Sequence, residues 1–489
     1  MSRIPVAARW CALIALLNAL AWSLVTPPFQ VADETGHLVY VQYLAETGEV
    51  PDNPGAAVFS PEQGAMLDAL RFNAVVGRPR DRALTTDILD AEVERLERER
   101  PSPVGGGGSV ESSPQPPLYY AAQAAVYQAS PWKGLLERVW LMRVFSCLLA
   151  AATTLFTFLF LRELVRTPWM WTLGALAVAF QPVFAFTSSG LTPDSLLFAA
   201  STATLFGLAR AFRRGLTMRL GLGIGAALAV GTLAKLNFVA LLPGALLGLA
   251  LLAAHAPADG RRRALIGAGA AVGVLAAAVV VYVGLNTLIW DRPALGGGVE
   301  NAANVAAGTQ AADQAPTTKA EQVSYVWQLY LPRLPFMNDQ FANHFPLWQT
   351  WFKGFIGLFG WLDTPFTEWV YRLALALVAP LLALLAFAFV RGRSGLRRRL
   401  PEIACYVAIA GGLMVSIGIL GLRYLEDTGN RFEQARYLLP LLPFYGAALA
   451  LAVRASGERF ARPLATAVLV VMIAHNVFSQ LLVISRFYG

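Results

Sequence analysis

The stretch PPFQVADETGHLVYVQYLAETG, residues 27–48, directly follows the first long apolar segment of the chain. Its two carboxylates, Asp33 and Glu34, stand where a membrane helix would meet water, and His37 follows them by one helical turn. Apolar residues then recur at helical spacing with polar residues between them, which is typical of a short helix lying along a membrane surface. The stretch therefore predicts an acidic pair held at the surface of a bilayer.

The composition is that of a membrane protein. Of the 489 residues, 56% are hydrophobic and 14% are charged, whereas soluble domains carry roughly 25% charged residues. Uncharged runs of roughly 17–25 residues can cross a bilayer, and their continuous apolar character favours helices over a β-barrel. We therefore expect an all-α integral membrane protein with about 11 transmembrane helices. The expected spans are residues 10–26, 139–161, 169–187, 195–211, 219–235, 238–255, 264–289, 368–390, 402–422, 437–453 and 464–484.

The arginines predict the orientation of these spans. Short arginine-rich loops belong on the cytoplasmic side, and this rule places the N-terminus inside. The pattern holds only if residues 117–132 form an interfacial helix on the outer face instead of crossing the bilayer. The net charge of +8 is then explained by the inner loops, so no nucleic-acid partner is expected. The arginine-rich loops are residues 162–166, 210–219, 261–263, 391–399 and 454–462.

This topology divides the chain into five parts. Residues 1–26 form the first transmembrane helix, uncleaved because no small-x-small site follows it. Residues 27–138 form a long extracytoplasmic loop that holds interfacial helices, a charged helix at 81–100 and a glycine-rich linker at 101–116. The remaining parts are a bundle at 139–289, the second outer loop at 290–367 and C-terminal helices at 368–489.

The second outer loop has two different halves. Its residues 294–318 are expected to be mobile and to become ordered over bound substrates. An aromatic-rich part follows them, which is typical of a headgroup belt or of the surroundings of a sugar ring.

Polar residues gather at the outer ends of the expected spans. Cations there could hold a phosphate leaving group at headgroup depth, and an ionised carboxylate could activate an incoming hydroxyl. The arrangement suits a reaction on a membrane-held phosphate compound. The candidate catalytic residues are Asp33 and Glu34, and the candidate substrate-binding residues are His37, Arg138, Asp194, Lys235, Arg436 and Tyr437.

Each candidate also has a simpler interpretation. One carboxylate of the pair in 27–48 could cap the following helix, and Asp194 could cap the fourth span. Lys235 and Arg436 could extend to the headgroups, and His37 could be a hydrogen-bonding neighbour. The carboxylate oxygens of the acidic residues are ligands suited to Mg²⁺ or Mn²⁺, so the sequence is compatible with a bound divalent metal. The spacing of these residues does not identify which of them would be metal ligands. The four histidines lack zinc spacing.

The acidic pair, the helix after it and QPPLYY (115–120) before an arginine-led second span resemble the GT-C glycosyltransferases. These include the protein mannosyltransferases and the lipid A aminoarabinose transferases. PPFQVADETGH, QPPLYY, WQLYLPRLPF (327–336), FGWLDT (359–364) and QARYLLP (434–440) are similar to a bacterial multi-pass family without an assigned substrate. The resemblance implies a bacterial cytoplasmic membrane, a polyprenyl-phosphate-linked sugar as donor and inversion at the sugar. It makes Asp33 the catalytic carboxylate and Arg436 a ligand of the carrier phosphate.

The leading hypothesis is therefore a glycosyltransferase that moves a sugar from a polyprenyl-phosphate carrier to an acceptor hydroxyl on the extracytoplasmic face. Asp33 would be the general base, with Glu34 the other candidate, and Arg436, Lys235 or Arg138 would hold the phosphate. The acceptor could be a glycan, a lipid or a protein. A transporter or flippase for a lipid-linked sugar is the first alternative, although such proteins usually carry midplane charges and internal repeats. A lipid-linked glycan polymerase or ligase is the second.

Overall fold

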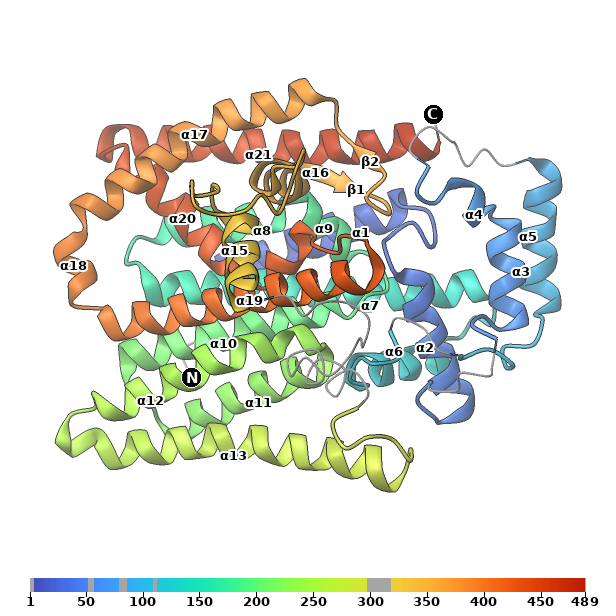
Figure 1. The fold of residues 1–489 in the computed structure, drawn as a ribbon, viewed down its shortest axis with the longest axis horizontal. Helices are drawn as coiled ribbons and strands as arrows, with labels where there is room; N and C mark the ends of the chain where they lie inside the picture. Colours follow the sequence, from blue (N-terminus) through green and yellow to red (C-terminus); the bar gives the residue numbers. More distant parts are fainter. Residues whose placement is uncertain (1–3, 52–56, 79–85, 109–111, 297–317, 489) are drawn as a thin grey trace.

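The computed structural model describes residues 4–51, 57–78, 86–108, 112–296 and 318–488. Most of these residues form long helices that run roughly along the long axis of the molecule (Figure 1). The helices of the bundle are α1 (Val6–Val25), α7 (Leu135–Leu164), α8 (Pro168–Ala179), α9 (Pro182–Ser188), α10 (Asp194–Arg214), α11 (Met218–Ala234), α12 (Leu242–Ala254), α13 (Ala258–Leu288), α17 (Glu368–Arg391), α19 (Leu400–Thr428), α20 (Leu442–Ala455) and α21 (Glu458–Phe487).

The expected all-helical, multi-pass fold is confirmed, with a lower count of clear spans. Within the described residues, nine helical segments are long and apolar enough to cross a membrane, or ten if the bent pair of α8 and α9 is counted as one span. The expected span at 169–187 is instead two helices, α8 and α9, bent by 60° at a break before Pro182. The expected span at 219–235 is α11, whose 17 residues reach about 26 Å, less than the roughly 30 Å of a hydrocarbon core.

Two of the bundle segments begin with a short 3-10 helix. η1 (Leu236–Leu241) leads into α12, and η3 (Ala435–Leu441) leads into α20. The residues just before them, Lys235 and Gln434, have extended backbone conformations. Lys235, at the first break, and Arg436, in the first turn of η3, are both buried.

Short helices of the first loop gather at one end of the bundle, on the right in Figure 1. Residues 117–132 hold α6 (Leu118–Ala129), which is about 18 Å long and packs on α2 and α7 instead of crossing the bundle. The expected charged helix is α5 (Asp87–Glu99). The other helices of this group are α2 (Glu34–Thr47), α3 (Pro61–Ala69) and α4 (Phe72–Val75).

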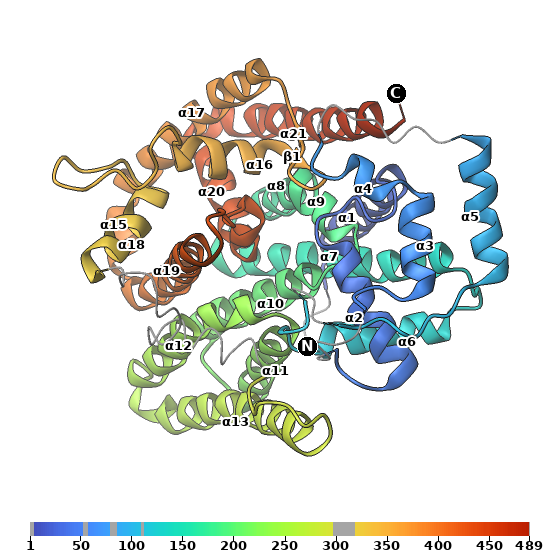
Figure 2. The same cartoon turned by 45° about the vertical axis from the view of Figure 1, so that its right-hand side comes forward.

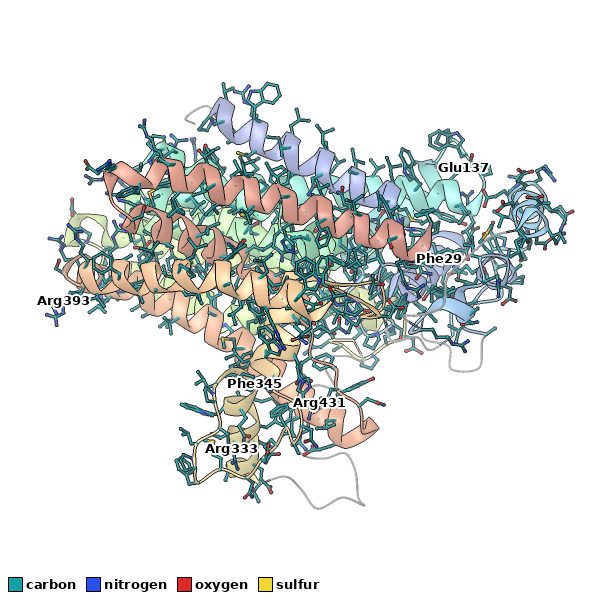
Figure 3. The ribbon with its side chains drawn as sticks, turned by 90° about the horizontal axis from the view of Figure 1, so that it is seen from above. Phe29, Glu137, Arg333, Phe345, Arg393 and Arg431 are labelled. Atoms are coloured by element: carbon teal, nitrogen blue, oxygen red, sulfur yellow. The ribbon has the colours of Figure 1, made fainter. Side chains whose placement is uncertain are left out.

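The second loop carries α15 (Lys319–Tyr330), the π-helix η2 (Leu347–Phe352) and α16 (Lys353–Gly357). A two-residue strand β1 (Leu358–Phe359) then pairs antiparallel with β2 (Thr364–Pro365). The segment expected to order over substrates falls mostly on 297–317, outside the described residues. α15 and the adjoining end of α19 project from the bundle, where Arg333, Phe345 and Arg431 are labelled in Figure 3.

Some aromatic residues of the second loop are buried and others are exposed. Tyr325 and Trp351 are buried, and the Trp351 ring stacks on Tyr330 with 5.1 Å between centroids. Phe336 is strongly exposed. The belt interpretation therefore fits only part of the group, because its buried members pack the projecting segment against the bundle.

The arginine-rich loops meet at the end of the bundle opposite the first-loop helices. Glu163 accepts ion pairs from Arg210 at 3.0 Å and Arg214 at 2.9 Å, and Glu402 pairs with Arg213 at 2.9 Å. α18 (Arg393–Arg397) lies at this end, on the left in Figure 1. The loops that the arginine count assigned to one side of the membrane are thus neighbours in space.

α10 lies in the middle of the bundle and connects the two ends (Figure 2). It packs chiefly on α7 and α11, and its apolar window is the most buried of the nine candidate spans found in the described residues. It begins at Asp194 and finishes in the arginine cluster. Its first turn therefore belongs to the end of the bundle where the candidate site lies.

Candidate active site

The turn between α1 and α2 sends its two adjacent carboxylates in different directions. Two prolines, at 27 and 28, end α1, because proline cannot continue the helical hydrogen bonding and restricts the residue before it. Phe29 and Asp33 then adopt left-handed backbone conformations with φ of 66° and 67°. Aspartate tolerates this region better than phenylalanine does. As a result the Asp33 side chain keeps 35% of its surface exposed, whereas that of Glu34 is fully buried.

Glu34 is held by a buried, two-pronged ion pair with Arg143 of α7. The Arg143 Nε lies 2.7 Å from Glu34 Oε1, and its Nη2 lies 2.6 Å from Oε2. Glu34 also accepts hydrogen bonds from the backbone N–H groups of Phe29 and Leu191, at 2.8 and 2.9 Å. One carboxylate thus joins α2, α7, the turn and the loop before α10.

Arg143 also completes the end of α1. Its guanidinium donates to the carbonyls of Ser23, Thr26 and Pro27 at 3.2, 2.7 and 2.9 Å. The last carbonyls of a helix have no partners within the helix, and a cation there also matches the helix dipole. The Arg143–Glu34 pair therefore sets the shape of the turn from which Asp33 projects.

Two further ion pairs lie beside this turn. Arg436, in η3, donates from Nη2 to Asp33 Oδ2. Lys235 donates from Nζ to Asp194 Oδ1 at 2.7 Å. Lys235, Arg436 and Asp194 are all buried, and Asp33 is the most accessible member of the four. The two acids and two bases leave the cluster close to neutral overall.

His37 and Asp33 have opposite charge states at neutral pH. Burial by itself would raise the pKa of Asp33, but Arg436, with smaller effects of His37 and Lys235, lowers it to about 2. Burial lowers the pKa of His37 to about 4, and its Nδ1 lies 3.0 Å from the Tyr120 hydroxyl. Asp33 is therefore ionised and His37 neutral at pH 7.

The simpler interpretations of these residues hold only in part. Asp33 occupies the N-cap position of α2, yet its side chain makes no capping hydrogen bond. The N-cap residue of α10 is Pro193, and Asp194 lies in the first turn of that helix, where its side chain pairs with Lys235. Lys235 and Arg436 are buried in ion pairs instead of reaching toward solvent. His37 does have the hydrogen-bonding partner that its simpler interpretation requires.

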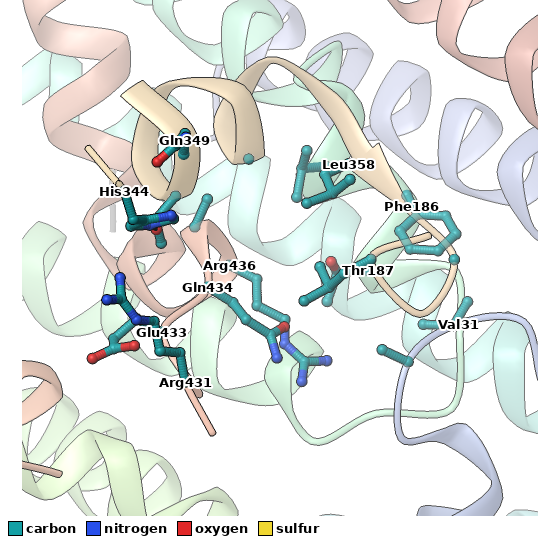
Figure 4. A pocket seen from close by; sticks show the side chains of 17 residues that line it. Val31, Phe186, Thr187, His344, Gln349, Leu358, Arg431, Glu433, Gln434 and Arg436 are labelled. Atoms are coloured by element: carbon teal, nitrogen blue, oxygen red, sulfur yellow. Dashed lines mark hydrogen bonds between the residues drawn. The ribbon is translucent and has the colours of Figure 1, made fainter. Parts of the chain in front are cut away.

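A cavity of about 210 Å³ opens next to Arg436. Segments distant in the sequence line it: the turn after α1, the helix α9, the stretch 344–362 and residues 431–436 (Figure 4). Ala32 is part of the lining, so the cavity lies beside Asp33 without including it. Arg436 is shared by the ion-pair cluster and the cavity, and it connects them.

The structure brings together most, but not all, of the residues that the sequence singled out. Arg138 lies apart: it faces Glu46 at 3.9 Å and stacks over the Tyr127 ring at 4.0 Å. Glu34 turns away from the cluster to Arg143. The residues that do gather are Asp33, His37, Asp194, Lys235, Arg436 and Tyr437, whose ring centroid is 5.5 Å from the Arg436 guanidinium carbon.

The sequence did not identify the role of Arg143 or the cavity. A useful signal was present, because Arg143 stands inside the apolar run LMRVFSCLL, and a charged residue in a span needs a partner. The cavity had no such signal, since its lining comes from four separate segments.

The carboxylates of this cluster do not form a ready divalent-cation site. Asp33 is already ion-paired with Arg436, and Asp194 is already ion-paired with Lys235. Across the residues that the structure describes, no group of three or more His, Cys, Asp or Glu side chains converges on one point.

Comparisons with known proteins give one family and one distant structural likeness. Two crystal structures of the Archaeoglobus fulgidus oligosaccharyltransferase, one apo and one tethered to an acceptor peptide containing the NVT sequon, align at 11% and 10% identity. Their TM-scores are 0.45 and 0.41, too low for a functional conclusion. The alignments cover 97% and 98% of this chain but 56% and 55% of the oligosaccharyltransferase, so this chain spans about half its length.

No curated protein matches the sequence. A family model does match, over residues 16–445, which is most of the chain. The family is described as predicted membrane proteins, in agreement with the helical bundle and its candidate spans. The chain belongs to this family, DUF2142.

Proposed function

We propose that this protein is a GT-C-type glycosyltransferase that moves a sugar from a polyprenyl-phosphate carrier to an acceptor hydroxyl. The observation that carries the proposal is the pair of carboxylate–cation contacts, Asp33–Arg436 and Asp194–Lys235, beside a cavity at one end of the bundle. The sequence resemblance of the acidic pair and of QARYLLP supports the same class. By the arginine count, this end faces the extracytoplasmic side of a bacterial cytoplasmic membrane.

The carrier phosphate would bind at Lys235 and Arg436. Both cations are paired with carboxylates before substrate arrives, so a phosphate would compete with Asp194 and Asp33 for them. Charge-assisted contacts between Arg or Lys and phosphate are among the strongest hydrogen bonds in proteins. The isoprenoid tail would lie between the spans, in contact with the bilayer.

Phosphate binding would also activate the base. With a pKa of about 2, Asp33 is ionised but accepts protons poorly, and the Arg436 charge is the main cause of that low pKa. When Arg436 turns to the phosphate, Asp33 loses part of this stabilisation and its pKa rises. The base thus becomes effective only when the donor is in place.

The chemical step is a single displacement. Asp33 takes the proton of the acceptor hydroxyl, and that oxygen forms a bond to the anomeric carbon. The bond between this carbon and the phosphate oxygen breaks, and the electron pair leaves with the polyprenyl phosphate. Attack opposite to the leaving group inverts the anomeric centre, and Lys235 and Arg436 stabilise the departing phosphate charge.

Glu34, His37 and Tyr437 have supporting roles in this scheme. Glu34 is a positioning residue, because its oxygens are occupied by Arg143 and two backbone N–H groups. The neutral His37, bonded to Tyr120, holds α2 against α6 next to Asp33. Tyr437 lies against Arg436 and limits where the guanidinium can move.

The test is release of carrier by purified protein in lipid nanodiscs supplied with polyprenyl-phosphate sugars and a hydroxyl acceptor. Removal of a positioned general base commonly lowers rates by about 10²–10⁴-fold, so Asp33→Asn should lose most turnover. Asp68→Asn makes the same chemical change on an exposed face of α3 and should retain full activity. Normal turnover by Asp33→Asn would refute the mechanism.

The same assay separates the transporter alternative. A flippase would move the lipid-linked sugar across the bilayer of a proteoliposome and leave the bond between sugar and phosphate intact. Movement without any release of free carrier would therefore replace the transferase proposal with transport. A polymerase or ligase would release carrier only when the acceptor is itself lipid-linked.

A further inference from the structure

The cavity beside Arg436 contains polar groups that have no partner. The Oε1 atom of Gln434 and the Nε atom of Arg436 are buried, and neither has a hydrogen-bond partner within the described chain. Both residues line the cavity. Figure 4 shows the Gln434 and Arg436 side chains among those that line the cavity.

Such groups indicate a ligand. Buried polar atoms are nearly always hydrogen-bonded, and leaving one unpaired is unfavourable. Gln434 offers an acceptor and Arg436 a donor, so a ligand that pairs with both atoms must donate to the first and accept from the second. A hydroxyl group does both, and two adjacent hydroxyls on one ring could satisfy the two atoms together.

The remaining lining matches a ring that is apolar on one face. Val31, Val183, Phe186 and Leu358 give the cavity an apolar side. Sugar rings present C–H groups on such a face and hydroxyls at their edge, and they commonly pack on apolar and aromatic side chains. At about 210 Å³ the cavity is smaller than the roughly 300–1,000 Å³ of drug-sized ligand sites, which suits one ring and not an oligosaccharide.

The far rim of the cavity has its own polar contacts. The His344 Nε2 lies 3.0 Å from the Thr350 hydroxyl, and Glu433 accepts a hydrogen bond from Tyr325. The Arg431 guanidinium stacks over Phe341 at 4.6 Å. These groups already have partners, so they shape the rim, and the unpaired atoms of Gln434 and Arg436 are the ones that select a ligand.

We propose that this cavity is a pyranose subsite in which Gln434 Oε1 accepts from, and Arg436 Nε donates to, hydroxyls of a single neutral sugar ring. The inference rests on the proposed function, because Arg436 would then hold the carrier phosphate through its terminal Nη2 group and the sugar through its Nε group. Gln434 thereby becomes the residue that recognises the sugar, next to the cation that recognises the carrier.

Binding to the purified protein in nanodiscs tests the subsite without requiring turnover. The probes are undecaprenyl phosphate and its glucosyl, mannosyl, galactosyl and N-acetylglucosaminyl derivatives. Wild type should bind at least one glycosylated carrier more tightly than bare carrier. Gln434→Met should lose this preference, roughly three- to tenfold for one hydrogen bond, and keep its affinity for bare carrier.

Two further variants complete the test. Gln322→Met makes the same substitution on α15, where the amide has no hydrogen bond within the described chain, and should behave as wild type. Gln434→Glu keeps the shape of the side chain but would pair with Arg436, and it should lose the preference as well. Gln434→Glu decides the result if Gln434→Met does not elute as a folded monomeric species.

The outcomes separate the subsite from the function on which it rests. Equal binding of bare and glycosylated carriers by wild type, or a preference retained by the Gln434 variants, would overturn the subsite while carrier recognition stands. Failure of wild type to bind bare carrier would overturn the proposed function. Binding of methyl pyranosides that depends on Gln434, with bare carrier present, would assign the ring to the acceptor instead of the donor.

Discussion

Replacing Glu34 with glutamine should destabilise the fold, whereas the same change at its neighbour Asp33 should mainly affect activity. Glu34 is fully buried and accepts four hydrogen bonds, two from Arg143 and two from backbone N–H groups. Glutamine has one acceptor oxygen and no charge, so it leaves a buried arginine without its counter-charge. Asp33 is partly exposed beside a cavity that water can enter.

The expected magnitudes differ clearly. Removing one partner of a buried ion pair typically costs about 3–5 kcal/mol, and we expect Glu34→Gln to lie in this range. Fully exposed pairs contribute only about 0–1 kcal/mol. The Asp33–Arg436 pair is intermediate, because Arg436 is buried but Asp33 keeps 35% of its side-chain surface exposed, so Asp33→Asn should cost more than an exposed pair and less than Glu34→Gln. A difference of about 1–2 kcal/mol is already a large fraction of the stability of an ordinary domain.

Denaturant unfolding of detergent-solubilised protein, followed by tryptophan fluorescence at pH 7, measures both values. A double-variant cycle sharpens the result: Arg143→Gln should cost less in the Glu34→Gln background than in wild type, because the counter-charge is already gone. Arg143→Gln should still lower the free energy of unfolding in that background, since Arg143 also donates hydrogen bonds to three carbonyls at the end of α1. A Glu34→Gln protein as stable as wild type, or more stable than Asp33→Asn, would refute the reasoning.

Two other predictions concern the same site. Lys235→Met should weaken binding of bare undecaprenyl phosphate by roughly tenfold or more, as expected for a lost charge-assisted contact, whereas Arg138→Met should not; equal losses in both would contradict the phosphate site. The pKa of His37 is lowered from 6.5 to about 4, so the unfolded chain binds a proton that the folded chain does not between these values. Folding stability should therefore fall as pH drops from about 6.5 toward 4, and His37→Asn should flatten this slope in unfolding midpoints measured at pH 7 and pH 5.

The membrane character and the two-ended arrangement could be read from the sequence. Span length, apolar content and arginine bias are local properties, so they survive without knowledge of packing. They grouped Asp33, Asp194, Lys235 and Arg436 at one end of the spans, and the structure pairs these four residues. Local signals did not show the bend within residues 169–187, where a break before Pro182 divides one apolar run into two helices.

The separate roles of Asp33 and Glu34 were decided only by tertiary structure. The two carboxylates are adjacent and chemically alike, and no local pattern tells which faces inward. The left-handed turn at Asp33 and an arginine 109 residues away from Glu34 make that choice. The cavity likewise exists only because four distant segments meet. The sequence by itself could determine which end of the bundle carries the polar residues, whereas long-range ion pairing and packing determined which of them are available for substrate.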